Sequence, residues 1–276
     1  IVRTGREAIS GLERTTWSMA DGLRVIQNYI AEAGVRVAAG EVMSRALRSH
    51  AAVHPGVRAY VFGNTIKHSG YNGIWVRTAS TVERNYIENA CLVLDDGAGI
   101  YVGNGNNSVI KDNLIVQIPG AIEGKPDAQR YPQAQGILLD DLSTGVSVIG
   151  NTVVGAENGI HLHNAFNNRI ESNRLYGNRN YELFVQEDSK ATRPDGDMYG
   201  NAIVGNVMVP IQAKPSLMQS TLFGSTADFS SYGGNVYSSL LSPQMAREVW
   251  SGGERTYLFA DWQAATFGSA PRNLDA

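Results

Sequence analysis

A short alternation of apolar and polar positions returns seven times along the chain. Each copy has an aliphatic residue, two variable residues, an asparagine, one variable residue and a second aliphatic residue. Successive asparagines lie 36, 21, 28, 38, 22 and 33 residues apart, so a unit of about 21 to 23 residues recurs with insertions. The seven asparagines are Asn28, Asn64, Asn85, Asn113, Asn151, Asn173 and Asn206.

The repeat unit predicts strands rather than helices, because its short β-branched runs are broken by Gly, Asn and Ser. One unit cannot bury its own apolar side, whereas stacked units share a continuous core, and a buried asparagine at each corner can bond backbone groups that the bend leaves unpaired. The pattern predicts an all-β fold, a single-stranded right-handed parallel β-helix of about seven to eight coils over residues 1–236. Residues 237–276 are expected to form an irregular C-terminal cap, and the whole is expected to be part of a longer chain.

A second phrase, Gly-Ile followed by two further strand residues, recurs in four successive units. Strand side chains alternate, so the isoleucine and the residue two positions later point inward, and the residues between them face outward. Coils about 4.8 Å apart then align the outward residues in columns. The first column, expected to be exposed, holds Trp75, Tyr101, Leu138 and His161, and the second holds Arg77, Gly103, Asp140 and His163.

Aromatic rings beside hydrogen-bonding groups suit a sugar, which has an apolar ring face and a hydroxyl edge. Trp75, Tyr101, Arg77 and His161 are therefore candidate substrate-binding residues. The alternative is that the exposed aromatic residues pack under a neighbouring loop or against another chain.

Two neighbouring units are longer at the same corner. The stretch from the asparagine to the next Gly-Ile strand takes 9 and 8 residues in the shortest units, but 14 and 23 in these two. The first insertion contains Asp95 and Asp96, and the second contains Lys125 and Arg130, which could bind substrate. Loops on a rigid scaffold often carry binding and catalysis, although an insertion can also be a neutral excursion. We expect the two insertions to wall one side of the aromatic column.

Two carboxylate pairs are candidates for catalysis, Asp95-Asp96 and Asp140-Asp141. Glycoside hydrolysis needs two carboxyl groups in one cleft, a general acid and a base or nucleophile, and like charges close together raise one of the two pKa values. Each pair could also be a turn that caps its own backbone, or hold a structural or catalytic calcium ion. His163, one coil beyond Asp140, could orient a carboxylate, bind a hydroxyl group or act as a base.

Composition narrows the function classes further. The net charge of −3 and the dispersed Lys and Arg residues argue against a nucleic-acid partner. No segment approaches the roughly 20 apolar residues that a membrane-spanning helix needs. No HExxH, P-loop, Cys cluster or Gly-x-Ser-x-Gly motif occurs, so metalloprotease, NTPase and serine-hydrolase functions are set aside, and calcium is the one cofactor kept open. The oligomeric state stays open.

Three segments resemble right-handed β-helix carbohydrate-active proteins, and most of all the group around glycoside hydrolase family 141. The resemblance covers roughly residues 60–210. It implies a secreted or periplasmic enzyme that acts on a polysaccharide or oligosaccharide, with one acid from each of two motifs, Asp96 or Asp95 and Asp140 or Asp141. The similar segments are Leu94–Val102, Gly136–Gly145 and Gly159–Asn164.

Two alternatives accompany this hydrolase hypothesis. A polysaccharide lyase that acts on an acidic glycan would rely on cationic side chains, which Lys125, Arg130 and Arg77 could supply. A non-catalytic glycan-binding protein of the tailspike or adhesin type would use the aromatic column without cutting its ligand. The Asp-Pro-His signature of the alginate epimerases, which share the fold, is missing.

Overall fold

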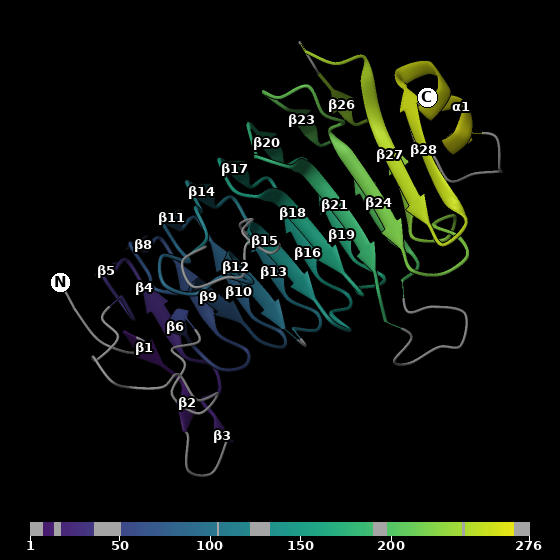
Figure 1. Cartoon of the computed structure of the whole chain (residues 1–276). Coiled ribbons are helices and arrows are strands. Elements are labelled where there is room, and N and C mark those ends of the chain that lie inside the picture. The colour runs from purple at the N-terminus through teal and green to yellow at the C-terminus, as the bar shows by residue number, and fades with distance from the viewer. Residues whose placement is uncertain are drawn as a thin grey trace.

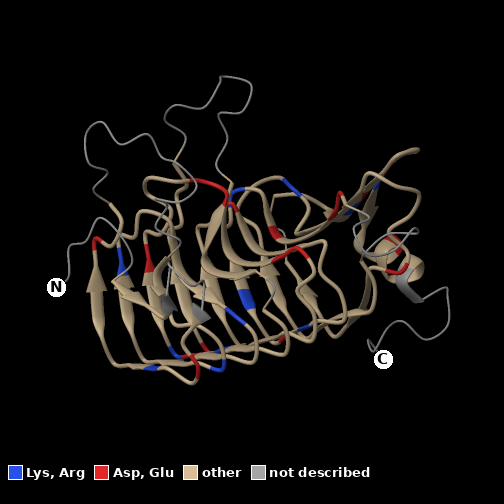
Figure 2. Ribbon diagram, turned by 90° about the horizontal axis from the view of Figure 1, so that it is seen from below, with Lys and Arg blue, Asp and Glu red and all other residues tan. Residues whose placement is uncertain are grey.

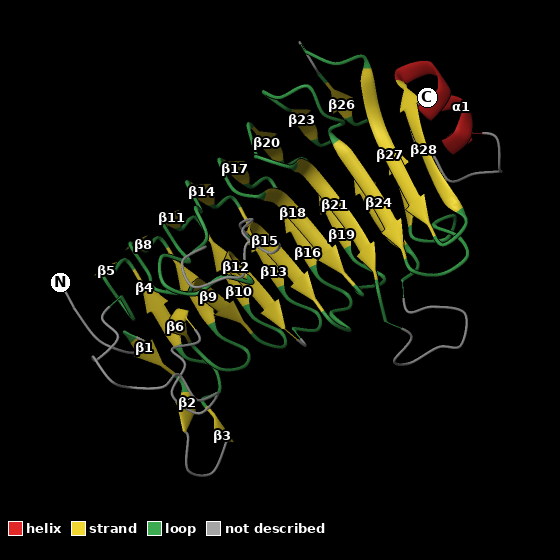
Figure 3. Ribbon diagram, in the orientation of Figure 1, coloured by secondary structure: helices red, strands yellow, loops and turns green. Residues whose placement is uncertain are grey.

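The computed structural model describes residues 8–13, 18–35, 51–103, 105–121, 133–189, 198–238 and 241–267. The chain winds as a parallel β-helix, in which each coil gives one strand to each of three sheets and then returns to the first (Figure 1). Two of the sheets hold eight strands each. Figure 3 shows that the helix α1 (Phe259–Phe267) lies at the C-terminal end of the stack.

The largest sheet has ten strands and carries the Gly-Ile phrases. Its neighbours pair in parallel, and Ile74, Ile100, Ile137 and Ile160 are aligned partners on successive strands. The final pair, β27 with β28, is antiparallel. The strands, in spatial order, are β1 (Ile9–Ser10), β6 (Ala51–His54), β9 (Asn72–Val76), β12 (Gly97–Gly103), β15 (Ala134–Asp140), β18 (Asn158–His163), β21 (Tyr181–Glu187), β24 (Leu217–Thr221), β27 (Gln244–Trp250) and β28 (Gly253–Leu258).

The two smaller sheets flank each corner asparagine. One contains β4 (Arg24–Ile26), β7 (Tyr60–Phe62), β10 (Thr81–Glu83), β13 (Val109–Lys111), β16 (Ser147–Ile149), β19 (Arg169–Glu171), β22 (Asn201–Val204) and β25 (Ser230–Gly233). The other contains β5 (Tyr29–Ala31), β8 (Thr65–Lys67), β11 (Tyr86–Glu88), β14 (Leu114–Val116), β17 (Thr152–Val154), β20 (Arg174–Tyr176), β23 (Val207–Val209) and β26 (Val236–Tyr237). A separate antiparallel pair joins β2 (Leu12–Glu13) and β3 (Ser18–Met19).

The repeated asparagines form a ladder inside the corner between the two smaller sheets. Asn151 is fully buried, and its Nδ2 donates hydrogen bonds to Asn173 Oδ1 at 3.0 Å and to the carbonyl of Ile110 at 2.9 Å. In return its Oδ1 accepts from the backbone N–H and from Nδ2 of Asn113, at 3.0 and 2.9 Å. The same pattern joins every coil and continues to Asn235, beyond the seven copies of the repeat.

The bend before each ladder asparagine has a common backbone conformation. The preceding residue has a positive φ, for example 54° at Arg84, 66° at Gly150 and 63° at Gly205. This left-handed conformation turns the chain sharply and leaves the next asparagine pointing into the corner, where its amide bonds the neighbouring coils. The two aliphatic residues of each repeat face the solenoid interior and are buried, as the alternation predicts.

The glycine that opens each Gly-Ile phrase permits close approach between coils. A Cβ atom at Gly73 would lie 2.5 Å from the carbonyl oxygen of Gly99, and one at Gly136 would lie 2.5 Å from that of Gly159. Because both obstacles are backbone atoms, a larger residue would push the coils apart. The glycines thus allow the strands that carry the Gly-Ile phrase to pack closely.

The solenoid extends further than the predicted boundary at residue 236. The strand β27 still pairs in parallel with β24, so the largest sheet continues through Trp250. The antiparallel β28 and α1 then close the end, where Trp262 is 3% exposed and packs against Tyr232 and Tyr257. The helix α1 therefore covers the C-terminal end of the solenoid core.

Candidate functional site

A groove of about 400 Å³ lies over the largest sheet, where the ends of β15, β18 and β21 meet. Five carboxyl groups line it, and they come from four successive coils. Strand alternation directs Asp140, His161 and His163 outward, whereas the other acids stand on the connections before or after a strand. The lining carboxyl groups are Asp96, Asp140, Asp141, Glu157 and Asp188.

Asp140 is the most firmly held of these acids. Its Oδ2 accepts a hydrogen bond from the Tyr101 hydroxyl at 2.7 Å, and its Oδ1 lies 2.7 Å from His163 Nδ1. Burial alone would raise its pKa, but the bonds from His163 and Tyr101 favour the charged form and hold the pKa of Asp140 below its usual range. Asp140 is thus an ionised, oriented carboxylate.

His163 bridges two acids. Its Nδ1 faces Asp140, and its Nε2 lies 3.1 Å from Asp188 Oδ1. Burial opposes protonation, yet the two carboxylates outweigh it and raise the pKa of His163 to about 9. The ring is therefore an imidazolium whose two N–H groups each donate a hydrogen bond to a carboxylate, and its role in orienting Asp140 stays a prediction.

Asp141, the second aspartate of the Asp140-Asp141 pair, has other hydrogen-bond partners than Asp140. Asp141 has 64% of its side chain exposed, and its Oδ1 accepts from Asn164 Nδ2 at 2.8 Å. The same Asn164 amide reaches Asp188 Oδ1 at 2.9 Å. Ligand atoms of Asp140, Asp141 and His163 lie within 4.8 Å of one another, so the three side chains could hold a metal ion, and the calcium site stays a prediction.

The first predicted pair, Asp95 and Asp96, is split by the fold. The Asp95 carboxylate accepts from the backbone N–H of Gln133 at 2.8 and 3.0 Å, so it joins the two insertions, as a capping residue does. Asp96 has a φ of 60° and lines the groove, while its carbonyl accepts from the Tyr71 hydroxyl at 2.6 Å. Asp96 and Asp140 therefore share one groove.

Glu157 is a groove acid that the sequence interpretation missed. Its side chain is 15% exposed and lies 3.3 Å from Arg179 Nε. Burial raises the pKa of Glu157 above its usual range, although the Arg179 charge opposes this. The signal was an acid directly before the Asn158-Gly159 opening of a strand, but nothing in the local sequence showed that this corner faces the groove.

The first outward column differs from the prediction at two positions. Leu138 and His161 were expected to be exposed, but they are 5% and 8% exposed. The His161 ring stacks on Phe184 of the next coil, with centroids 4.5 Å apart and planes at 15°. Outward side chains one coil apart cover each other in this way, and burial together with the nearby His163 charge lowers the pKa of His161 to about 3.

The remaining column residues contact one another closely. His54 stacks on the Trp75 ring at 4.9 Å, the Arg77 guanidinium lies 5.3 Å from its centroid, and Tyr101 meets it edge-on at 5.2 Å. Arg77 also donates to the carbonyl of Gly103 at 2.9 Å. Trp75, Arg77 and Tyr101 are only half-buried, and their role in substrate binding stays a prediction.

Lys125 and Arg130 lie outside the described residues, so their predicted contact with substrate is not addressed. Among the residues that are described, Lys and Arg positions are dispersed and form no continuous basic stripe along the solenoid (Figure 2). The one helix in those ranges is too short to span a membrane.

The pKa values of the two groove histidines should be shifted in opposite directions. We expect His163 to lose its proton near pH 9 and His161 to stay neutral down to about pH 3, because carboxylates flank the first and burial desolvates the second. The stability from His163 is full below its unfolded pKa of about 6.5 and is lost as the pH rises through 9. The stability from neutral His161 is lost as the pH falls below about 6.5. Histidine NMR titrations check both values, and two ordinary pKa values near 6.5 would contradict the geometry.

Comparisons with known proteins identify the fold. No curated protein sequence matches the chain significantly. The solved structure of XylC with xylose aligns with a TM-score of 0.51 at 12% identity, over 82% of this chain and 42% of XylC. The tailspike protein of E. coli bacteriophage HK620, in complex with a pentasaccharide, aligns with a TM-score of 0.51 at 14% identity, over 86% of this chain and 48% of the tailspike.

At these identities the likeness shows the fold alone, and the chain spans less than half the length of each of these two proteins. The profile of the right-handed β-helix region family matches residues 47–221, which is more than half of the chain. The chain belongs to the right-handed β-helix family.

Proposed function

We propose that this protein hydrolyses glycosidic bonds of a neutral glycan in the groove over β15, β18 and β21. Asp140 serves as the ionised carboxylate, and Asp141 serves as the general acid. The observation that carries the proposal is that these two carboxyl groups have oxygen atoms within 4.8 Å of each other in one groove, while His163 and Tyr101 hold the pKa of Asp140 below its usual range. Two carboxyl groups about 5–5.5 Å apart are the pair that a retaining glycosidase uses.

The proposed reaction requires one proton on the enzyme. Asp141 gives that proton to the glycosidic oxygen as the bond from this oxygen to the anomeric carbon breaks. Asp140 either attacks the anomeric carbon or takes a proton from the attacking water. His163 and Tyr101 keep Asp140 ionised and fixed in orientation through their hydrogen bonds.

The charge of the groove favours an uncharged substrate. Its described lining holds five carboxyl groups and one imidazolium, so an anionic glycan would meet like charge. This argues for hydrolysis over the alternative of a lyase on an acidic glycan. XylC holds xylose and the tailspike holds a pentasaccharide, which supports a sugar ligand here, and membership of the glycoside hydrolase family 141 group and export from the cell are further parts of this proposal.

The general acid can be tested separately from Asp140. We expect Asp141→Asn to lower kcat on an unactivated polysaccharide by about 10²–10⁴-fold, because the leaving oxygen then receives no proton. Activity should be largely retained on an aryl glycoside, whose leaving group needs no proton.

Asp96→Asn is the matched variant, because Asp96 lines the same groove and is the acid predicted from the sequence. If Asp96→Asn shows the leaving-group dependence and Asp141→Asn does not, then Asp96 is the acid. Reducing-sugar release from a panel of neutral polysaccharides measures hydrolysis, and the ultraviolet absorbance of an unsaturated product would reveal a lyase instead. A glycan that binds but survives prolonged incubation would indicate a non-catalytic binding protein.

A further inference from the structure

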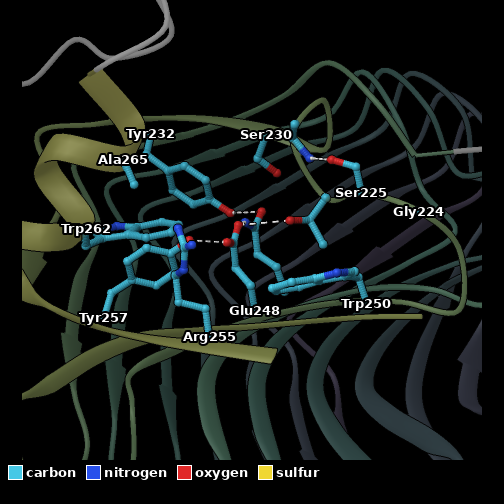
Figure 4. A pocket seen from close by; sticks show the side chains of 13 residues that line it. Gly224, Ser225, Ser230, Tyr232, Glu248, Trp250, Arg255, Tyr257, Trp262 and Ala265 are labelled. Atoms are coloured by element: carbon cyan, nitrogen blue, oxygen red, sulfur yellow. Dashed lines mark hydrogen bonds between the residues drawn. The ribbon is translucent and has the colours of Figure 1, made fainter. Parts of the chain in front are cut away.

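A second cavity, of about 440 Å³, lies at the C-terminal end of the solenoid (Figure 4). Residues of β24, β25, β27, β28 and α1 line it, together with the segment around Gly224 and Ser225. It shares no residue with the groove over β15, β18 and β21. Nothing in the proposed hydrolysis uses it.

A single carboxylate is held in fixed orientation inside this cavity. Glu248 Oε1 accepts from Gln219 Nε2 and from Thr226 Oγ1, both at 2.9 Å, and Oε2 accepts from the Tyr257 hydroxyl. The Gln219 amide is itself fixed, because its oxygen accepts from the Tyr232 hydroxyl at 2.5 Å. A carboxylate offers about four lone-pair positions, so these three donors leave room for a hydroxyl group of a ligand.

Aromatic rings stand on both sides of that carboxylate. Figure 4 shows Glu248 between Trp250 and Tyr257, with Trp262 behind Tyr257. Trp250 is half-buried and offers a large apolar surface to the cavity, whereas Tyr257 and Trp262 are buried in the end cap. An oriented acceptor beside an aromatic face matches a pyranose ring, which has apolar C–H faces and an equatorial rim of hydroxyl groups.

The charges of the cavity decide which class of ligand it fits. Among the described lining residues only Glu248 and Arg255 are charged, and they carry opposite signs. Arg255, whose guanidinium lies 5.7 Å from the Tyr257 ring centroid, would repel a cationic ligand. Glu248 would repel an anionic ligand. We infer that this cavity binds a neutral sugar unit and forms a second glycan-binding site on the chain, remote from the groove.

The test measures binding of cellobiose, xylobiose and lactose to the whole chain by calorimetry and saturation-transfer NMR. We expect at least one disaccharide to bind, and Trp250→Ala to weaken that binding by about tenfold or more, as truncation of a buried aromatic anchor does. Tyr257→Phe, which keeps the ring and removes one donor to Glu248, should weaken it less. Tyr176→Ala removes an aromatic ring that is 50% exposed on another sheet and should leave binding unchanged.

The groove variant Asp140→Asn separates this inference from the proposed hydrolysis, because binding at the cavity should persist in it. The inference is overturned if none of the three disaccharides binds, or if choline or acetate binds more tightly than all of them. It is also overturned if binding disappears with Asp140→Asn but survives both cavity variants. Thermal unfolding of Trp250→Ala and of Tyr257→Phe, measured for each variant, shows whether each keeps the fold.

Discussion

Replacing Asp140 by asparagine is expected to lower kcat for glycan hydrolysis by about 10²–10⁴-fold, the range found when a positioned acid–base group is lost. The neutral amide can neither attack the anomeric carbon nor take a proton from water. The substitution also removes one negative charge beside His163, which keeps Asp188 at 3.1 Å and Asp141 at 3.7 Å as carboxylate partners. We therefore expect the pKa of His163 to fall towards its usual value in the same variant.

The Asp140→Asn result has two readouts. Hydrolysis is measured by reducing-sugar release, and the His163 titration by NMR reports whether the hydrogen-bonded cluster was disturbed as intended. Glu171→Gln is the control, because it removes a carboxylate from an exposed pair with Arg169 on a different sheet. Full activity in Asp140→Asn together with a lowered pKa of His163 would show that Asp140 has no part in the chemistry.

Replacing Asn151 by alanine is expected to give the largest loss of stability. The change removes the side-chain oxygen that accepts from the backbone N–H and Nδ2 of Asn113. It also removes the Nδ2 that donates to the Ile110 carbonyl, and all three hydrogen bonds are buried. Each orphaned buried group costs about 1–3 kcal/mol, so the free energy of unfolding should fall by several kcal/mol. Urea denaturation followed by circular dichroism measures this change.

Asn28→Ala is the matched control at the end of the same ladder. Asn28 is exposed, and its amide donates to Asn64 Oδ1 at 2.9 Å on one side. Its loss should cost less than about 1.5 kcal/mol, the net worth of one ordinary hydrogen bond. If Asn151→Ala and Asn28→Ala lowered the free energy of unfolding equally, burial of the ladder would add no stability beyond that of each hydrogen bond.

The coils were predictable because their signal is periodic. The aliphatic pair and the asparagine return in every unit, and counting from them places Asp140 and His163 on adjacent strands, where they are 2.7 Å apart. Glu157 and Asp188 were missed because they stand on connections, where strand alternation assigns no direction. The burial of His161 was missed for a different reason. Its ring stacks on Phe184 of the adjacent coil, and this contact depends on side-chain orientations that the pattern of a single strand does not predict.

The side-chain amides of the asparagine ladder form a row of dipoles aligned along the solenoid axis. From Asn28 to Asn235, each asparagine side chain donates from Nδ2 to the side-chain oxygen of the asparagine in the following coil. These aligned side-chain dipoles add as peptide dipoles do in an α-helix, but here the partial positive end lies towards the C-terminus. Two such solenoids stacked head to tail would continue the row of dipoles, whereas a head-to-head stack would bring like poles together.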